Sequence, residues 1–218
     1  RPGAPTIFGS FLASMSLRSG SPTFGTPEPA LGSLVIGQIA RRLNLPLRCA
    51  GNFATSKQAD GQAMVQGTLS FMSAVQCGAN FMLHSAGFLD GLLAMSYEKF
   101  VMDADLCGAM HSYMAGLQVD ENALAFDAIQ EVGPAHHFLD SQHTMQNYKT
   151  AYWESQLNDD RPFETWDETG RVDALQRANL SWKKTLKDYQ APELDIAKEE
   201  ALLAFMNKIK ANSADAWH

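Results

Sequence analysis

A histidine at the end of an apolar run is the clearest candidate for chemistry in this chain. The run Ala79–Leu83 stops at His84, and a turn of small residues, Ser85–Gly87, follows it. In a parallel α/β barrel, side chains at the carboxyl ends of buried strands line the active site. We therefore expect the imidazole of His84 to face a ligand at such a rim. A core histidine with satisfied hydrogen bonds is the alternative interpretation.

The other histidines that suggest a site form one group after a Gly-Pro break. His136, His137 and His143 lie near Asp140, and zinc sites combine imidazole ligands with nearby carboxylates. Adjacent histidines point apart on any regular element, so a site with all three as ligands is awkward. We favour capping and packing over metal binding here.

The elements that must position these side chains alternate between strand and helix in the first half. They are, in chain order, strand 5–9, helix 28–43, strand 45–50, helix 62–76, strand 81–84 and helix 92–117. This alternation predicts a parallel sheet. Three strands cannot close an eight-stranded barrel, so we expect the other strands to lie in sequence that is absent here. The stripe expected to face the core from the first helix is Leu31, Leu34, Val35, Ile39 and Leu43.

From about residue 120 the pattern becomes mainly helical. A helix is expected to start at Asp120, a residue suited to the N-cap position. Further helices are predicted over 143–155, 167–188 and 192–211. We interpret this half as a helical cover and divide the chain into barrel units, 1–118, and a helical region packed on them, 119–218.

Composition limits the classes of function that need considering. The 218 residues are 45% hydrophobic, which suits a globular domain with a core, and the net charge of −7 argues against a nucleic-acid partner. No apolar run is long enough for a transmembrane helix, and the N-terminus has no signal-peptide core. Three widely spaced cysteines favour reduced thiols in a cytoplasmic protein. Because the chain begins at Arg1 and enters a strand almost at once, we expect a fragment of something longer.

Four blocks in a fixed order carry a resemblance to a known family. They are PGAPTIFGSF with LRSGSPTFGTPEPAL (2–31), LPLRCAGNFATSKQADGQA (45–63), the segment from 78 to 108 that contains His84, and VGPAHHFLDSQHT (132–144). Each block is weak alone, but together they span about residues 2–165. The chain resembles the C-terminal part of the trimethylamine methyltransferase family.

The resemblance implies a fold and an activity. Family members are (β/α)8 TIM barrels that transfer a methyl group from a methylated amine to the cobalt of a separate corrinoid protein. No cofactor would be bound directly, because the corrinoid would be carried by the partner protein. A catalytically incomplete fragment, or a non-catalytic binding or assembly domain of the same fold, is the alternative function. A homo-oligomer is a further possibility that the sequence leaves open.

One departure from the family bears on the substrate. Trimethylamine enzymes of this family carry pyrrolysine in the loop after the penultimate strand, whereas the corresponding loop here, 51–57, contains only ordinary residues. The chain is therefore similar to the branch without pyrrolysine, whose members demethylate quaternary amines such as glycine betaine. A quaternary nitrogen is already cationic, so the enzyme needs mainly to hold the cation and its carboxylate in line with the cobalt.

The resemblance also implies which residues would contact such a substrate. His84 could hydrogen-bond the carboxylate, while Asn52 and Phe53 lie in the special loop, where Phe53 could offer a cation–π face. Glu28 could balance the cationic ligand, although a helix-start role is slightly favoured. Phe11 could form an aromatic wall.

The competing interpretations of these residues are structural. The loop with Asn52 and Phe53 could be an ordinary connection with Gly51 as its turn. Phe11, together with Phe24, could simply pack in the core. Lys57 is expected to form a salt bridge, because a cationic substrate would repel it.

Overall fold

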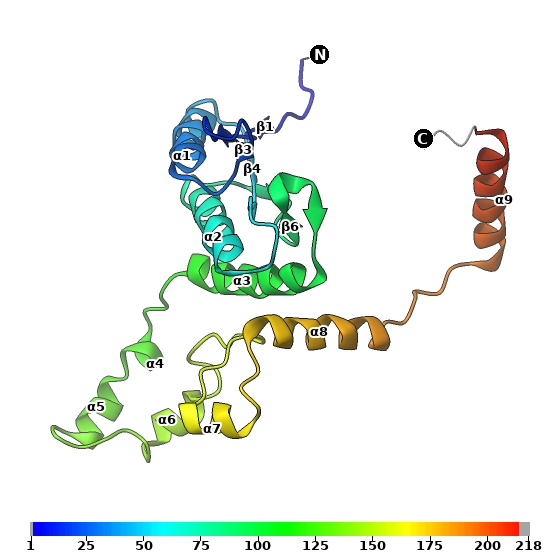
Figure 1. The fold of residues 1–218 in the computed structure, drawn as a ribbon. Coiled ribbons are helices and arrows are strands. Elements are labelled where there is room, and N and C mark those ends of the chain that lie inside the picture. Colours follow the sequence, from blue (N-terminus) through cyan, green and yellow to red (C-terminus); the bar gives the residue numbers. More distant parts are fainter. Residues whose placement is uncertain (1, 214–218) are drawn as a thin grey trace. The chain divides into compact units, whose positions relative to one another are not determined.

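The computed structural model describes residues 2–213 as a mixed α/β architecture (Figure 1). Three short strands form a parallel sheet, as the alternation of strand and helix predicted. These strands are β1 (Phe8–Gly9), β4 (Leu47–Ala50) and β5 (Phe81–Leu83), and they lie side by side in the order β1-β4-β5. Their parallel pairing brings the three carboxyl ends to the same edge of the sheet.

Two helices connect these strands. Helix α1 (Pro27–Arg42) follows β1, and helix α2 (Gly61–Gln76) follows β4. Both were predicted within a residue, and both have clear start signals: Pro27 occupies the first turn of α1, and Asp60 caps α2 by accepting a hydrogen bond from the Ala63 amide at 2.9 Å.

The buried core between the sheet and the helices is small. Its buried members come from α1, β4 and the end of α2, and they are Ala40, Leu47, Cys49, Ala74 and Cys77. The side of α1 expected to face this core was largely wrong: Leu31, Val35, Ile39 and Leu43 are exposed, and only Leu34 packs against it. Helix α1 instead packs through its small residues Gly37 and Ala40, both buried.

The segment after β5 differs from the expected continuous helix over 92–117. Residues 88–95 form a small antiparallel hairpin of β6 (Phe88–Leu89) and β7 (Ala94–Met95), joined by a short 3-10 turn, η1 (Asp90–Leu92). Asp90 and Leu92 have φ angles of 48° and 78°, which a right-handed helix cannot include. Helix α3 (Tyr97–Ala115) therefore starts later, where the Ser96 hydroxyl accepts a hydrogen bond from the Lys99 amide at 3.2 Å. A second hairpin, β2 (Ser14–Met15) with β3 (Pro22–Thr23), lies within the loop after β1.

The second half is helical, as predicted, but its helices are shorter. They are α4 (Glu121–Leu124), α5 (Phe126–Val132), α6 (Gln142–Asn147), α7 (Phe163–Glu168), α8 (Ala174–Asp188) and α9 (Ile196–Asn212). Left-handed residues account for two of the breaks: Ala125, with φ 51°, separates α4 from α5, and Gly170 and Arg171 follow α7. The chain forms two compact units, one up to Lys183 and the other from Lys184 on. The proposed division at residue 118 stays a prediction.

Candidate functional site

The candidate site lies at the edge where the three parallel strands end. Phe11 follows β1, Asn52 and Phe53 follow β4, and His84 directly follows β5. Loops at the carboxyl ends of parallel strands are where α/β proteins place ligand sites. Four of the five residues expected to contact substrate thus come from one edge of the sheet.

Five aromatic side chains meet at this edge and are called the aromatic cluster below. They are Phe11, Phe24, Phe53, His84 and Phe88. Phe53 is central, with its ring centroid 5.5 Å from that of Phe11 and 5.3 Å from that of Phe24. The imidazole of His84 lies 5.5 Å from Phe53 and 5.1 Å from Phe88. Mutually tilted and edge-on rings at these spacings form favourable aromatic pairs.

The aromatic cluster is closed at its base and open at its rim. Phe53 is 1% exposed and Phe24 is 5% exposed, whereas Phe11 is 49% exposed and His84 also faces solvent. Aromatic ring faces attract cations, and more strongly where water is excluded. An exposed imidazole beside such rings adds a group that can hydrogen-bond an anion. The exposed members of the aromatic cluster, Phe11 and His84, therefore offer a ring face for a cation and a group that can hydrogen-bond an anion, while Phe24 and Phe53 are packed beneath them.

His84 has an unusual backbone. Its φ of 58° lies in the left-handed region, which non-glycine residues rarely adopt. Such a residue persists only where its surroundings enforce the conformation, and these positions concentrate at functional sites.

The ends of β4 and β5 approach each other closely. A Cβ atom on Gly51 would lie 2.7 Å from the Cα of Ser85 and 2.9 Å from the carbonyl oxygen of Leu83, so only glycine fits there. Gly51 therefore lets the loops that carry Phe53 and His84 lie against each other. Gly51, where a turn was expected, thus permits close packing of the two loops.

Asn52 is fully buried beneath these loops. Its Nδ2 donates a hydrogen bond to the carbonyl oxygen of Ser85 at 2.7 Å, and its Oδ1 has no hydrogen-bond partner. The structure thus places Asn52 behind the turn that follows His84, and its amide is shielded from solvent.

A buried ion pair on helix α3 lies next to the turn that follows His84. The Nζ of Lys99 is 2.6 Å from both carboxylate oxygens of Asp103, and both side chains are 0% exposed. Asp103 also accepts a hydrogen bond from the Gly87 amide at 2.9 Å. Burial raises the pKa of Asp103, while the Lys99 ammonium and the Gly87 N–H oppose that shift.

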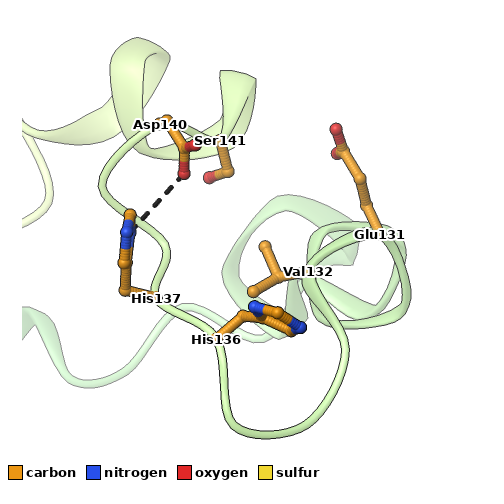
Figure 2. Close-up of a pocket in the computed structure, with 6 residues that line it drawn as sticks. All are labelled: Glu131, Val132, His136, His137, Asp140 and Ser141. Atoms are coloured by element: carbon orange, nitrogen blue, oxygen red, sulfur yellow. Dashed lines mark ion pairs between the residues drawn. The ribbon is translucent and has the colours of Figure 1, made fainter.

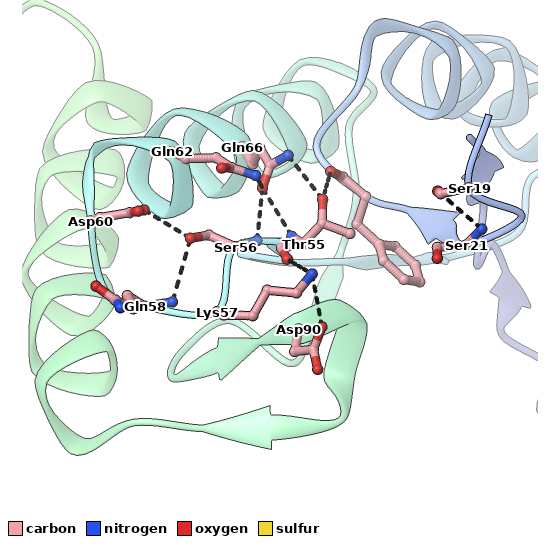
Figure 3. Close-up of polar contacts among 11 residues, drawn as sticks. Ser19, Ser21, Thr55, Ser56, Lys57, Gln58, Asp60, Gln62, Gln66 and Asp90 are labelled. Atoms are coloured by element: carbon pink, nitrogen blue, oxygen red, sulfur yellow. Dashed lines mark hydrogen bonds and ion pairs between the residues drawn. The ribbon is translucent and has the colours of Figure 1, made fainter. Parts of the chain in front are cut away.

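A polar framework fixes the rest of the loop between β4 and α2 (Figure 3). The Thr55 amide donates to Oε1 of Gln66 at 2.9 Å, and Nε2 of Gln66 donates to the Thr55 hydroxyl at 2.9 Å. The Ser56 hydroxyl donates to Asp60 at 2.9 Å. Lys57 forms an ion pair with Asp90 at 3.0 Å, in line with its expected salt bridge, and this pair is exposed. The framework thereby joins the loop to both α2 and the β6–β7 hairpin.

Glu28 lies apart from this arrangement, in the exposed first turn of α1. Its own backbone N–H and the Thr26 hydroxyl lower the pKa of its carboxyl group, which are the interactions of a helix-start acid. The structure describes no contact between Glu28 and the aromatic cluster.

The sequence drew attention to neither Phe88 nor the burial of Asn52. Phe88 follows His84 by four residues, and its ring reaches the aromatic cluster because the intervening turn reverses the chain. The only sequence signal for this turn was its run of small residues.

His136 and His137 of the second histidine group line a separate cavity of about 290 Å³ (Figure 2). Within it, Nδ1 of His137 lies 3.6 Å from Oδ1 of Asp140, and both side chains are largely exposed. Nowhere in residues 2–213 do three or more His, Cys, Asp or Glu side chains converge to hold a metal ion. His143 instead contacts the Asn122 carbonyl oxygen at 2.7 Å, which fits the expected packing role.

Comparison with known proteins shows that the chain is similar to methyltransferases. It is 40% identical to a glycine betaine methyltransferase of Desulfitobacterium hafniense (strain Y51) over 205 residues, which cover 94% of this chain and 43% of that protein. It is 30% identical to a trimethylamine methyltransferase of Methanosarcina mazei over 209 residues, 95% of this chain and 41% of that protein. The chain therefore spans less than half the length of these curated relatives.

Among the described helices, none combines the length and hydrophobicity that a membrane span requires.

The family model for trimethylamine methyltransferase matches residues 1–214, nearly the whole sequence. The chain belongs to the trimethylamine methyltransferase family.

Proposed function

We propose that this chain is the C-terminal part of a (β/α)8 barrel in a methyltransferase that demethylates a quaternary amine such as a betaine. The methyl acceptor would be the cobalt of a separate corrinoid protein. The single observation that carries this proposal is the aromatic cluster at the carboxyl ends of β1, β4 and β5. Family membership and the glycine betaine methyltransferase among the relatives support the same reaction class.

In this scheme the aromatic cluster binds the methylated cation. Phe11, which is half-exposed, would present its ring face to the cation, with the buried Phe53 packed behind it, and a cation–π contact of this kind contributes about 0.5–2 kcal/mol. A betaine carboxylate lies a short distance from its quaternary nitrogen. The exposed imidazole of His84, at the rim, is suited to hydrogen-bond that carboxylate and so to orient the substrate.

The positive charge of the quaternary nitrogen also bears on release of the product. A corrinoid partner would supply nucleophilic Co(I) as the methyl acceptor, and no residue of this chain is assigned to hold that group. The C–N bond breaks with its electron pair left on nitrogen, so the immediate product is a neutral tertiary amine. Until that amine takes up a proton from water, the aromatic rings attract it less strongly than they attract the cationic substrate.

The loop after β4 favours a quaternary over a tertiary amine. Residues 51–57 are all ordinary, so no pyrrolysine is present to capture a tertiary amine covalently. Non-covalent binding by aromatic rings needs a positive charge, which a quaternary nitrogen has at every pH and a tertiary amine has only while it is protonated.

The test compares charged and neutral substrates of one shape. Methyl transfer from a panel of betaines to cob(I)alamin is followed by absorbance with the purified protein, and affinities are measured by calorimetry. Glycine betaine should bind at least about tenfold more tightly than 3,3-dimethylbutyrate, in which carbon replaces the charged nitrogen. Equal affinities would contradict the cation site. Binding without methyl transfer from any betaine would favour the non-catalytic alternative.

A further inference from the structure

The turn that connects two members of the aromatic cluster is held in a strained shape. His84 and Phe88 flank residues 85–87, and their ring centroids lie 5.1 Å apart. His84 and Gly87 both have left-handed backbones, with φ angles of 58° and 87°. A left-handed histidine is not the preferred state of a free loop, so other contacts must enforce it.

Two buried side chains contact this turn from the side opposite the solvent. Nδ2 of Asn52 donates to the Ser85 carbonyl oxygen at 2.7 Å, and Oδ2 of Asp103 accepts from the Gly87 amide at 2.9 Å. Both side chains are 0% exposed. They therefore bind the backbone on the two sides of Ala86, and neither is open to a ligand arriving from solvent.

Each of these side chains is itself fixed in place. Lys99 binds both carboxylate oxygens of Asp103 at 2.6 Å, and Gly51 brings the loop with Asn52 directly against Ser85. Two buried groups, one on α3 and one after β4, thus converge on three consecutive residues.

The chemistry of Asn52 points to a role beyond packing. Its Oδ1 is buried without a hydrogen-bond partner, a costly state that an apolar residue of the same shape would avoid. The hydrogen bond to Ser85 is the interaction that such a residue would lack.

We propose that Asn52 and Asp103 are positioning residues that lock the turn 84–88 and thereby set the spacing of His84 and Phe88 around the substrate. This inference rests on the proposed function. Asn52, expected from the sequence to touch substrate, would act through the turn instead. Loosening the turn would separate the imidazole and the Phe88 ring from Phe53 and weaken a site that needs all three.

The decisive variant is Asn52→Leu, which keeps the shape of the side chain and removes its hydrogen bond. Asn80→Leu is the matched control, because Asn80 also makes one side-chain hydrogen bond, from the Leu47 amide at 2.9 Å, at the opposite end of β4. The double variant Lys99→Met/Asp103→Leu removes the second contact without leaving a buried charge, and it takes the place of Asn52→Leu if that variant does not fold.

Two measurements follow. Hydrogen–deuterium exchange in the turn 84–88 should become at least about tenfold faster in Asn52→Leu and stay unchanged in Asn80→Leu. The KM for glycine betaine should rise about tenfold in Asn52→Leu, with kcat changed less than about threefold, because part of the binding site is displaced. A purely structural role would instead lower kcat through loss of folded enzyme and leave KM unchanged.

The outcomes are separable. Unchanged exchange in the turn would show that Asn52 does not hold it, and faster exchange with an unchanged KM would show that holding the turn does not serve the site; either result overturns the proposal. If the wild-type protein neither binds nor demethylates any quaternary amine, the proposed function fails. The exchange data then still report whether Asn52 and Asp103 hold the turn.

Discussion

The strand-end region and the helical region after residue 119 treat their polar groups in opposite ways. Around the sheet, Asn52, Lys99 and Asp103 are completely buried and fixed by short contacts. In the helical region, ion pairs such as His137–Asp140 are exposed to solvent. Buried polar groups are costly unless partnered, but they hold a geometry that exposed pairs cannot. Precise positioning of buried polar groups is therefore concentrated in the first region.

The two regions are joined through α3. Glu98 accepts hydrogen bonds from Nδ2 of Asn179 at 2.7 Å and from Nε1 of Trp182 at 2.8 Å, and Trp182 stacks on Tyr97 with centroids 4.9 Å apart. Further along α3, Asp105 accepts from the Ser155 hydroxyl at 2.5 Å. Helix α3 therefore carries the buried pair Lys99–Asp103 and also Glu98 and Asp105, whose side chains accept hydrogen bonds from the helical region.

The largest expected effect comes from breaking the buried pair. Lys99→Ala leaves the Asp103 carboxylate buried without its cation and should lower the free energy of unfolding by about 3–5 kcal/mol. Arg171→Ala removes the exposed partner of Asp167 and should cost less than about 1 kcal/mol. Urea denaturation of both variants measures the contrast, and similar losses would remove the distinction between the regions.

The next effect separates binding from packing. Phe53→Leu should destabilise the protein by about 1–2 kcal/mol and weaken glycine betaine binding about tenfold, because the ring against which Phe11 and His84 pack is lost. Phe71→Leu is the control, since Phe71 is also buried but lies in α2 outside the aromatic cluster. Calorimetric binding should distinguish the two variants even where their thermal unfolding is alike.

A smaller, pH-dependent effect tests the junction between the regions. Hydrogen bonds from Asn179 and Trp182 lower the pKa of Glu98 to about 2. A carboxyl group with a depressed pKa stabilises the fold above its unfolded value, and this contribution is lost as pH falls from about 4.5 towards 2. Glu98→Gln should therefore cost about 1 kcal/mol at pH 7, allowing for solvent screening. The cost should shrink across that acidic range in urea titrations, and a cost independent of pH would refute the assignment.

The smallest effect is expected within the helical region. Tyr152 is 84% exposed, so Tyr152→Ser should change the free energy of unfolding by less than about 0.5 kcal/mol. Thermal unfolding provides the measurement. A loss comparable to that of Phe53→Leu would show that Tyr152 is packed in solution.

Much of the sheet and the origin of the site could be predicted from the sequence. Strand–helix alternation implies parallel strands, and parallel strands end at one edge, so the meeting of Phe11, Phe53 and His84 follows from topology. The predictions that were wrong depended on contacts between residues distant in sequence. The apolar stripe of α1 was misassigned because close packing favoured its small residues Gly37 and Ala40 over its large ones.

The β6–β7 hairpin that follows the turn after His84 could not have been predicted from local pattern. Its left-handed residues include Asp90 and Leu92, and leucine rarely adopts that conformation. Their conformation fits bonds from elsewhere: the Asp90 amide donates to the Ser56 carbonyl oxygen at 2.8 Å, and the Gly91 amide donates to that of Ala54 at 2.9 Å. The same interactions bring Phe88 into the aromatic cluster, which explains why its role was missed.

The left-handed backbone of His84 has a consequence for protein engineering. Glycine would adopt that backbone without strain, so a selection that rewards heat resistance alone has a simple route to improvement at this position. That route deletes the imidazole. If His84 orients the substrate as proposed, variants selected only for heat resistance would lose substrate binding at this position first, and such a selection needs an activity screen at every round.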